Sequence, residues 1–145
     1  FVHDEASAFF GGLAGNAGLF STARDVARVY QMLLNGGEID GQRYLSKETC
    51  QLFTTEISKI SRRGLGFDKP DADDPKKGNC APAAPAEVYG HTGFTGTCAW
   101  VDPMNELVYV FLSNRIYPDV TNRKLNQLHI RERIQGAIYD AMKKK

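Results

Sequence analysis

The twelve residues from Tyr89 to Trp100 constrain the fold of this chain more than any other stretch. Strand-forming side chains recur along it, but glycines interrupt it at Gly90, Gly93 and Gly96. Glycine weakens a strand, and it often marks a place where another backbone or a ligand comes close. The next residues, 101–105, predict a tight turn, and residues 107–112 form an unbroken apolar run. We therefore expect an antiparallel hairpin whose first strand keeps an accessible edge poor in side chains.

Three helices are predicted around this hairpin. Thr22 and Asp25 have the spacing of a capping box, apolar residues follow at helical intervals, and Asn35-Gly36-Gly37 provides a stop. Ser46 should cap a second helix over residues 47–55, and a third is predicted over residues 131–142. Because the 107–112 strand is apolar throughout, helices should cover both faces of the sheet.

The segments between these elements are less regular. Residues 63–67 predict a short strand, residues 38–44 predict a turn, and residues 122–130 are ambiguous. Residues 68–86 hold four of the six prolines together with several charges, which is typical of a surface loop rather than a helix.

Composition excludes several classes of function. The 145 residues fit one domain or a piece of a larger one. Because 42% of them are apolar, we expect a globular chain with a hydrophobic core, and Trp100 is expected to belong to that core. The formal net charge of +1 gives no reason to expect nucleic acid or an anionic membrane as a partner. No run of 18 apolar residues could span a bilayer.

Neither a metal nor a cofactor is expected. The three cysteines lack C-x-x-C spacing, so they are interpreted as small core residues or loop thiols. His3 and His129 lack H-x-x-x-H spacing, and the aspartates of residues 71–74 lack the glycine and distal glutamate of a calcium loop. The glycine-rich segment 11–18 precedes a helix, but it has no G-K-[ST], so its glycines are expected to let a buried loop pack closely.

His91-Thr92-Gly93 resembles the third signature box, Lys/His-Thr/Ser-Gly, of the serine β-lactamase and penicillin-binding-protein superfamily. Residues 11–23 and 110–115 resemble flanking stretches of its class C-like branch, which includes esterases and D-aminopeptidases. The resemblance implies an α/β (α+β) sandwich, in which an antiparallel sheet of three strands is flanked by helices as part of a β-lactamase/transpeptidase-like fold.

The resemblance also implies roles for individual residues. In that superfamily a serine attacks a carbonyl and forms an acyl-enzyme, while the third box faces the serine from an edge strand. His91 would polarise the site and contact substrate, the Thr92 hydroxyl would bind a substrate carboxylate, and Gly93 would keep the edge open. The backbone amide of Phe94 would be an oxyanion-hole donor.

The boxes that carry the nucleophile and the proton-transfer groups do not occur in the sequence. No serine begins an S-x-x-K box and no tyrosine begins a Y-x-N box. Tyr44-Leu45-Ser46 fits Y-x-S by letters, but it follows the 11–23 stretch, so it is interpreted as a helix entry.

Residues 1–145 are therefore expected to be the C-terminal part of a serine hydrolase domain, catalytically silent alone, whose nucleophile lies upstream. Histidine in place of lysine favours esterase or peptidase relatives over penicillin hydrolysis, because a neutral imidazole attracts a carboxylate less strongly than an ammonium does. The alternative is a binding or regulatory module that uses the same sheet edge.

These interpretations also predict partners. We expect a small-molecule or peptide substrate, the N-terminal part of the same protein, and possible self-association through an exposed sheet edge. The resemblance implies a periplasmic or secreted location.

Overall fold

A three-stranded antiparallel sheet in the order β3-β4-β5 forms the centre of the molecule. The computed structural model describes residues 4–55, 60–74 and 78–143. The strands are β3 (Tyr89–Thr92), β4 (Cys98–Asp102) and β5 (Leu107–Phe111). The antiparallel α/β arrangement of the sequence analysis is confirmed.

The predicted hairpin exists as β4 and β5, but its expected first strand is two strands. Residues 93–97 form a turn between β3 and β4, in which the Gly93 N–H donates to the Thr97 carbonyl at 2.8 Å. Gly96 adopts φ +92°, a conformation that favours glycine and reverses the chain. The glycines therefore divide the 89–100 stretch rather than leaving one long open edge.

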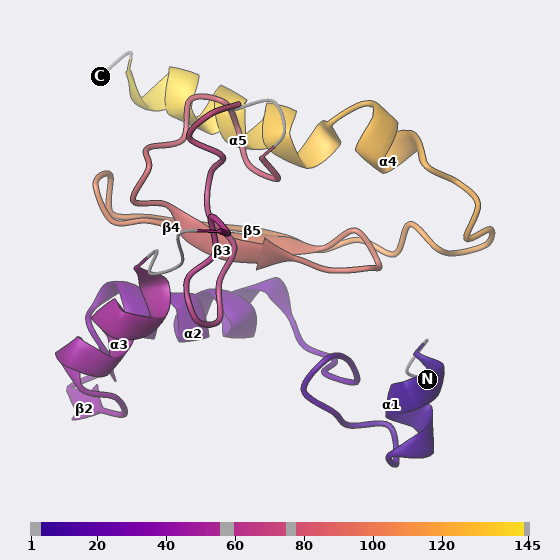
Figure 1. The fold of residues 1–145 in the computed structure, drawn as a ribbon, viewed down its shortest axis with the longest axis horizontal. Helices are drawn as coiled ribbons and strands as arrows, with labels where there is room; N and C mark the ends of the chain where they lie inside the picture. The colour runs from indigo at the N-terminus through magenta and orange to yellow at the C-terminus, as the bar shows by residue number, and fades with distance from the viewer. Residues whose placement is uncertain (1–3, 56–59, 75–77, 144–145) are drawn as a thin grey trace.

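Helices cover both faces of this sheet, as predicted (Figure 1). Helix α2 (Ala23–Leu34) packs on β4 and β5 from one side. Helix α5 (Ile130–Met142) lies on the other side, where the Tyr109 hydroxyl donates to the Arg131 carbonyl at 3.1 Å.

The core lies between the sheet and α5. Trp100 is only 1% exposed and packs in one cluster with Val88, Cys80, Cys98 and Tyr109. The three cysteines are all free and buried, which confirms their interpretation as small core residues.

The predicted helix caps are confirmed. The Thr22 hydroxyl accepts the Asp25 N–H at 3.2 Å, and Gly36 and Gly37 leave α2 with φ values of +67° and +95°. Ser46 caps α3 (Lys47–Thr54) by accepting the Thr49 N–H at 3.1 Å. Tyr44-Leu45-Ser46 is thus a helix entry, as expected.

The other elements are short. They are α1 (Glu5–Phe9), β1 (Glu38–Ile39), β2 (Gln42–Arg43) and α4 (Lys124–Gln127). The segment predicted as a turn is thus a small hairpin, in which Asp40 and Gly41 take positive φ. The ambiguous segment 122–130 contains α4 and the start of α5.

The predicted strand over residues 63–67 is wrong. Its chain bends back so that the Gly64 N–H donates to the Phe67 carbonyl at 3.1 Å, which an extended strand does not allow. Only Asp68, the next residue, pairs with the sheet, through a bridge to Gly90. The 68–86 loop is also less superficial than predicted, because Asp68, Lys69 and Cys80 are buried.

The glycine-rich segment 11–18 is not the buried loop that the sequence predicted. Leu13 is 76% exposed, and Leu19 and Phe20 just beyond it are exposed as well. Close packing is local: a Cβ on Gly18 would overlap the Gly12 carbonyl. In Figure 1 this segment and α1 lie apart from the sheet, so within the described residues the sheet does not bury them.

Candidate functional site

The His91 side chain is exposed on β3, an outer strand of the sheet. Its Nδ1 lies 2.6 Å from the Thr92 carbonyl oxygen. A carbonyl oxygen only accepts, so the ring makes this hydrogen bond when Nδ1 carries a hydrogen. The exposed imidazole can contact a ligand from solvent through its other nitrogen, Nε2.

The backbone N–H and C=O groups of Thr92, the next residue of β3, face the outer side of the sheet. Gly90 exchanges two backbone hydrogen bonds with Asp68 on the side away from β4. Backbone groups alternate in direction along a strand, so the N–H and C=O of Thr92 face the same outer side as those of Gly90. Thr92 thus continues the outer edge of β3 beyond the bridge.

Gly93 and Phe94 belong to the turn after β3. A Cβ on Gly93 would overlap the Thr97 hydroxyl, so this glycine lets the turn close tightly. The Phe94 side chain is 61% exposed, and its amide is the second in the turn. His91, Thr92, Gly93 and the Phe94 amide are therefore brought together as one exposed strand end and turn.

The segment after β5 holds this turn in place. The Thr95 carbonyl accepts the Arg115 N–H at 2.9 Å and the Ser113 hydroxyl at 3.1 Å. The Arg115 guanidinium lies over the Phe94 ring, 4.8 Å from its centroid, as a cation–π contact. Arg115 belongs to the 110–115 stretch that resembles the family, but the resemblance implies no function for it. Sequence spacing alone gives no sign of its contact with Phe94.

Tyr89 shares a sheet face with His91 but has a packing role. Its ring contacts Phe67 with centroids 5.3 Å apart, and Phe67 contacts Tyr30 of α2 at 6.2 Å. Burial raises the pKa of Tyr89 and of Tyr30. Both phenols therefore remain neutral near pH 7, so neither is a base next to His91.

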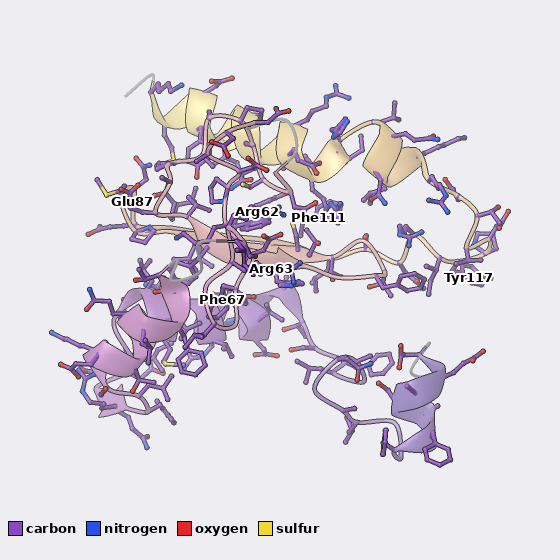
Figure 2. All side chains as sticks on the ribbon, viewed as in Figure 1. Arg62, Arg63, Phe67, Glu87, Phe111 and Tyr117 are labelled. Atoms are coloured by element: carbon purple, nitrogen blue, oxygen red, sulfur yellow. The ribbon has the colours of Figure 1, made fainter. Side chains whose placement is uncertain are left out.

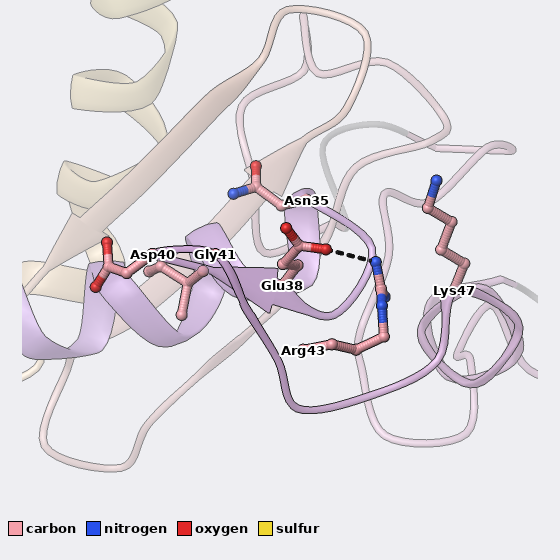
Figure 3. A pocket seen from close by; sticks show the side chains of 7 residues that line it. Asn35, Glu38, Asp40, Gly41, Arg43 and Lys47 are labelled. Atoms are coloured by element: carbon pink, nitrogen blue, oxygen red, sulfur yellow. Dashed lines mark hydrogen bonds and ion pairs between the residues drawn. The ribbon is translucent and has the colours of Figure 1, made fainter.

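The described residues also contain a shallow pocket of about 310 Å³ at the β1–β2 hairpin (Figure 3). Its charged lining residues are Glu38, Asp40, Arg43 and Lys47, and Glu38 pairs with Arg43 at 2.8 Å. Opposite charges that already satisfy one another offer little to a ligand. None of residues 91–94 lines this pocket.

Within the described part of the chain, no group of three or more His, Cys, Asp or Glu side chains could hold a metal ion. Asp71 instead accepts the N–H groups of Asp73 and Asp74, which closes a local turn. His129 directly precedes α5 in a left-handed conformation and makes no side-chain capping hydrogen bond, and His3 lies outside the described residues. None of the helices described is long and apolar enough to cross a membrane.

The sequence of this chain is similar to the sequences of known proteins. The family model described as Beta-lactamase matches residues 2–132. Proteins named putative D-alanyl-D-alanine carboxypeptidase from Escherichia coli (strain K12) and from Salmonella typhi are each 36% identical over 126 residues. These matches cover 86% of this chain but 29% of each relative, so the chain spans less than a third of the length of these relatives.

A solved structure is also similar to this chain. It is a penicillin-binding protein homologue from Caulobacter crescentus, with 26% sequence identity and a TM-score of 0.49. The match covers 61% of this chain and 24% of the other.

Proposed function

We propose, since this chain belongs to the beta-lactamase family, that it supplies one wall of the active site of a serine hydrolase. The reaction would cleave an ester, amide or peptide bond through an acyl-enzyme. The relatives named putative D-alanyl-D-alanine carboxypeptidase favour an amide bond next to a free carboxylate as the target. The attacking serine would come from polypeptide outside these 145 residues, because no serine in the sequence begins an S-x-x-K box.

The observation that carries this proposal is the exposed imidazole of His91 at the outer strand. Its Nε2 would accept a hydrogen bond from substrate or from the attacking hydroxyl. The Thr92 hydroxyl would bind a substrate carboxylate, and Gly93 would let the turn close beside the scissile bond.

The Phe94 amide would stabilise the oxyanion that forms when the serine attacks. A donor of this kind typically contributes about 3–4 kcal/mol to transition-state stabilisation. The Arg115 contact on the Phe94 ring and the two hydrogen bonds to Thr95 support this role, because they restrain the turn before substrate arrives. A donor that needs no reorganisation is the more effective one.

The test compares two histidine variants of the full-length protein on p-nitrophenyl acetate and on a peptide ending in D-alanyl-D-alanine. His91→Asn should lower kcat/KM about 100-fold or more, as is typical when one preorganised polar group that acts on the reacting bond is removed. His129→Asn is the matched control, because the His129 side chain makes no capping hydrogen bond at the start of α5 and asparagine tolerates its left-handed backbone, φ +49°. Equal activities of the two variants would contradict the proposal.

Residues 1–145 produced alone should be inactive on the same substrates and on nitrocefin. Turnover by this chain that His91→Asn abolishes would refute the assignment of the nucleophile to other polypeptide. A binding or regulatory module remains the second candidate, since the sequence has neither S-x-x-K nor Y-x-N. That candidate predicts saturable calorimetric binding of a cell-wall peptide by this chain, together with a full-length protein whose activity does not depend on His91.

A further inference from the structure

Asp68 is a buried carboxylate in the loop that runs toward β3. It is 1% exposed, and a charge that is buried this deeply is costly unless it is paired. Arg62 lies 2.9 Å from one carboxylate oxygen and donates to the other at 3.0 Å. The Asn79 amide donates at 2.9 Å, and the Lys69 backbone N–H at 3.0 Å. The carboxylate of Asp68 is thus held from several directions.

This arrangement keeps the Asp68 carboxylate ionised. Burial acts to raise the pKa of the group, but the hydrogen bonds from Asn79 and Arg62 outweigh it and leave the pKa below its ordinary value. Arg62 also donates to the Lys69 carbonyl at 3.0 Å, so its guanidinium contacts both the side chain of Asp68 and the backbone next to it. The Arg63 guanidinium is a weaker partner, 3.8 Å from the same carboxylate. Arg62 lies near the middle of the molecule (Figure 2).

The backbone of Asp68 transmits this restraint to β3. Its N–H donates to the Gly90 carbonyl at 2.7 Å, and its carbonyl accepts the Gly90 N–H at 3.0 Å. Gly90 directly precedes His91, and it is held on its other side by β4 opposite Trp100. Asp68 thus closes the outer edge of β3 at Gly90, and Thr92 is the next residue whose backbone faces that side.

We propose that Asp68 is a positioning residue for the active-site wall. Arg62 and Asn79 fix its carboxylate, its backbone fixes Gly90, and Gly90 fixes the orientation of His91 and Thr92. The bridge also sets one end of the accessible edge. A substrate that lies along β3 would therefore contact the backbone of this strand only from Thr92 onward. The inference rests on the proposed function of His91 and Thr92.

The test uses the full-length protein with Arg62→Gln and Asn79→Ala, which loosen the carboxylate without removing it. Tyr139→Phe is the matched control. Tyr139 donates to Asp102, the other nearly fully buried carboxylate of the described residues, at 2.8 Å, but Asp102 lies at the end of β4 away from His91. Asn79→Ala and Tyr139→Phe each lose one hydrogen bond to a buried carboxylate, so a general loss of stability should affect these two variants similarly. Arg62→Gln also loses a charge and a contact to the Lys69 carbonyl, so its loss of stability should be larger.

Two readouts separate positioning from stability. Hydrogen exchange in peptides that contain Gly90 and His91 should speed up at least 10-fold in Arg62→Gln and Asn79→Ala, and should stay unchanged in Tyr139→Phe. On p-nitrophenyl acetate, kcat should fall about 10-fold in the first two variants at nearly constant KM, whereas Tyr139→Phe should match the wild type. Arg62→Lys, which keeps the charge but loses the two-pronged contact, should restore part of kcat.

Each outcome decides the question. If exchange near Gly90 does not change in Arg62→Gln and Asn79→Ala, or if their kcat values equal that of Tyr139→Phe, Asp68 has no positioning role. If exchange rises as expected but His91→Asn keeps full activity, the restraint on β3 is supported and the proposed function of His91 fails. Should Arg62→Gln not fold, Asn79→Ala and Arg62→Lys provide the same comparison.

Discussion

Replacing Gly90 with alanine tests how tightly β3 is seated on the sheet. An ideal Cβ at this position would overlap the Ala99 carbonyl oxygen and lie 2.7 Å from Trp100 Cε3 and 2.8 Å from Trp100 Cα. None of these atoms can move easily, because two belong to the β4 backbone and the Trp100 ring is 1% exposed. The methyl group can be accommodated only if β3 shifts away from β4 or the indole leaves its position.

The expected cost follows from the rigidity of these neighbours. Overpacking a well-packed core costs about 1–3 kcal/mol. Because the clash involves a backbone carbonyl and a buried ring rather than a flexible chain end, we expect the upper end, about 3 kcal/mol. For a chain of 145 residues this corresponds to a fall in Tm of roughly 10 °C.

Trp100 provides the assay, since it is the only tryptophan in the sequence. Urea unfolding of the 145-residue chain, followed by tryptophan fluorescence, should show a lower midpoint for Gly90→Ala and an altered native emission maximum. Gly15→Ala is the control, because a Cβ at Gly15 meets nothing within 4 Å. If the two variants have the same midpoint, β3 does not pack as described.

Three further predictions concern a helix cap, two buried thiols and the acid limit of stability. Thr22→Ala removes the acceptor of the Asp25 N–H and should cost about 1 kcal/mol, measured by urea unfolding. Burial raises the pKa of Cys80 to about 12 and that of Cys98 to about 11, so native protein at pH 8 should react with Ellman's reagent at these positions only as fast as it unfolds. The pKa of Asp68 is lowered in the fold, so its contribution to stability is present above its ordinary pKa near 3.8 and is lost as pH falls through the folded value. Asp68→Asn should therefore flatten the acid limb of an unfolding curve.

Each of these predictions has a contradicting result. An unchanged urea midpoint in Thr22→Ala would mean that the cap is not formed. Rapid labelling of Cys80 or Cys98 in the native state would show that their region opens readily. An acid limb that is equally steep in Asp68→Asn and the wild type would assign acid unfolding to other carboxylates.

Local rules predicted α2, α3 and α5 well but did not predict the short helices α1 and α4. The starts of α2 and α3 follow from Thr22 and Ser46, because a hydroxyl that accepts an N–H three residues on needs nothing from the rest of the protein. The end of α2 follows in the same way from glycines that take positive φ at little cost. The β4–β5 hairpin was also predicted, since a turn and an apolar run lie next to each other in sequence.

The failed predictions concern segments whose structure depends on distant residues. Residues 63–67 have a strand-like sequence, but they bend against the end of α3, where a Cβ on Gly64 would lie 2.7 Å from the Phe53 carbonyl. The sequence predicted an open first strand, yet Asp68 pairs with Gly90 across 22 positions of chain. No local pattern contains either contact.

The sequence by itself determined the approximate limits of α2, α3 and α5, the β4–β5 hairpin and the burial of Trp100, because each depends on neighbouring residues or on polarity. Only the tertiary structure decided which backbone closes the edge of β3, which guanidinium covers Phe94, and how Arg62 and Asn79 hold Asp68. The physical reason is that a hydrogen bond or a ring contact forms wherever the folded backbone brings two groups within about 3–5 Å, whatever their separation in sequence.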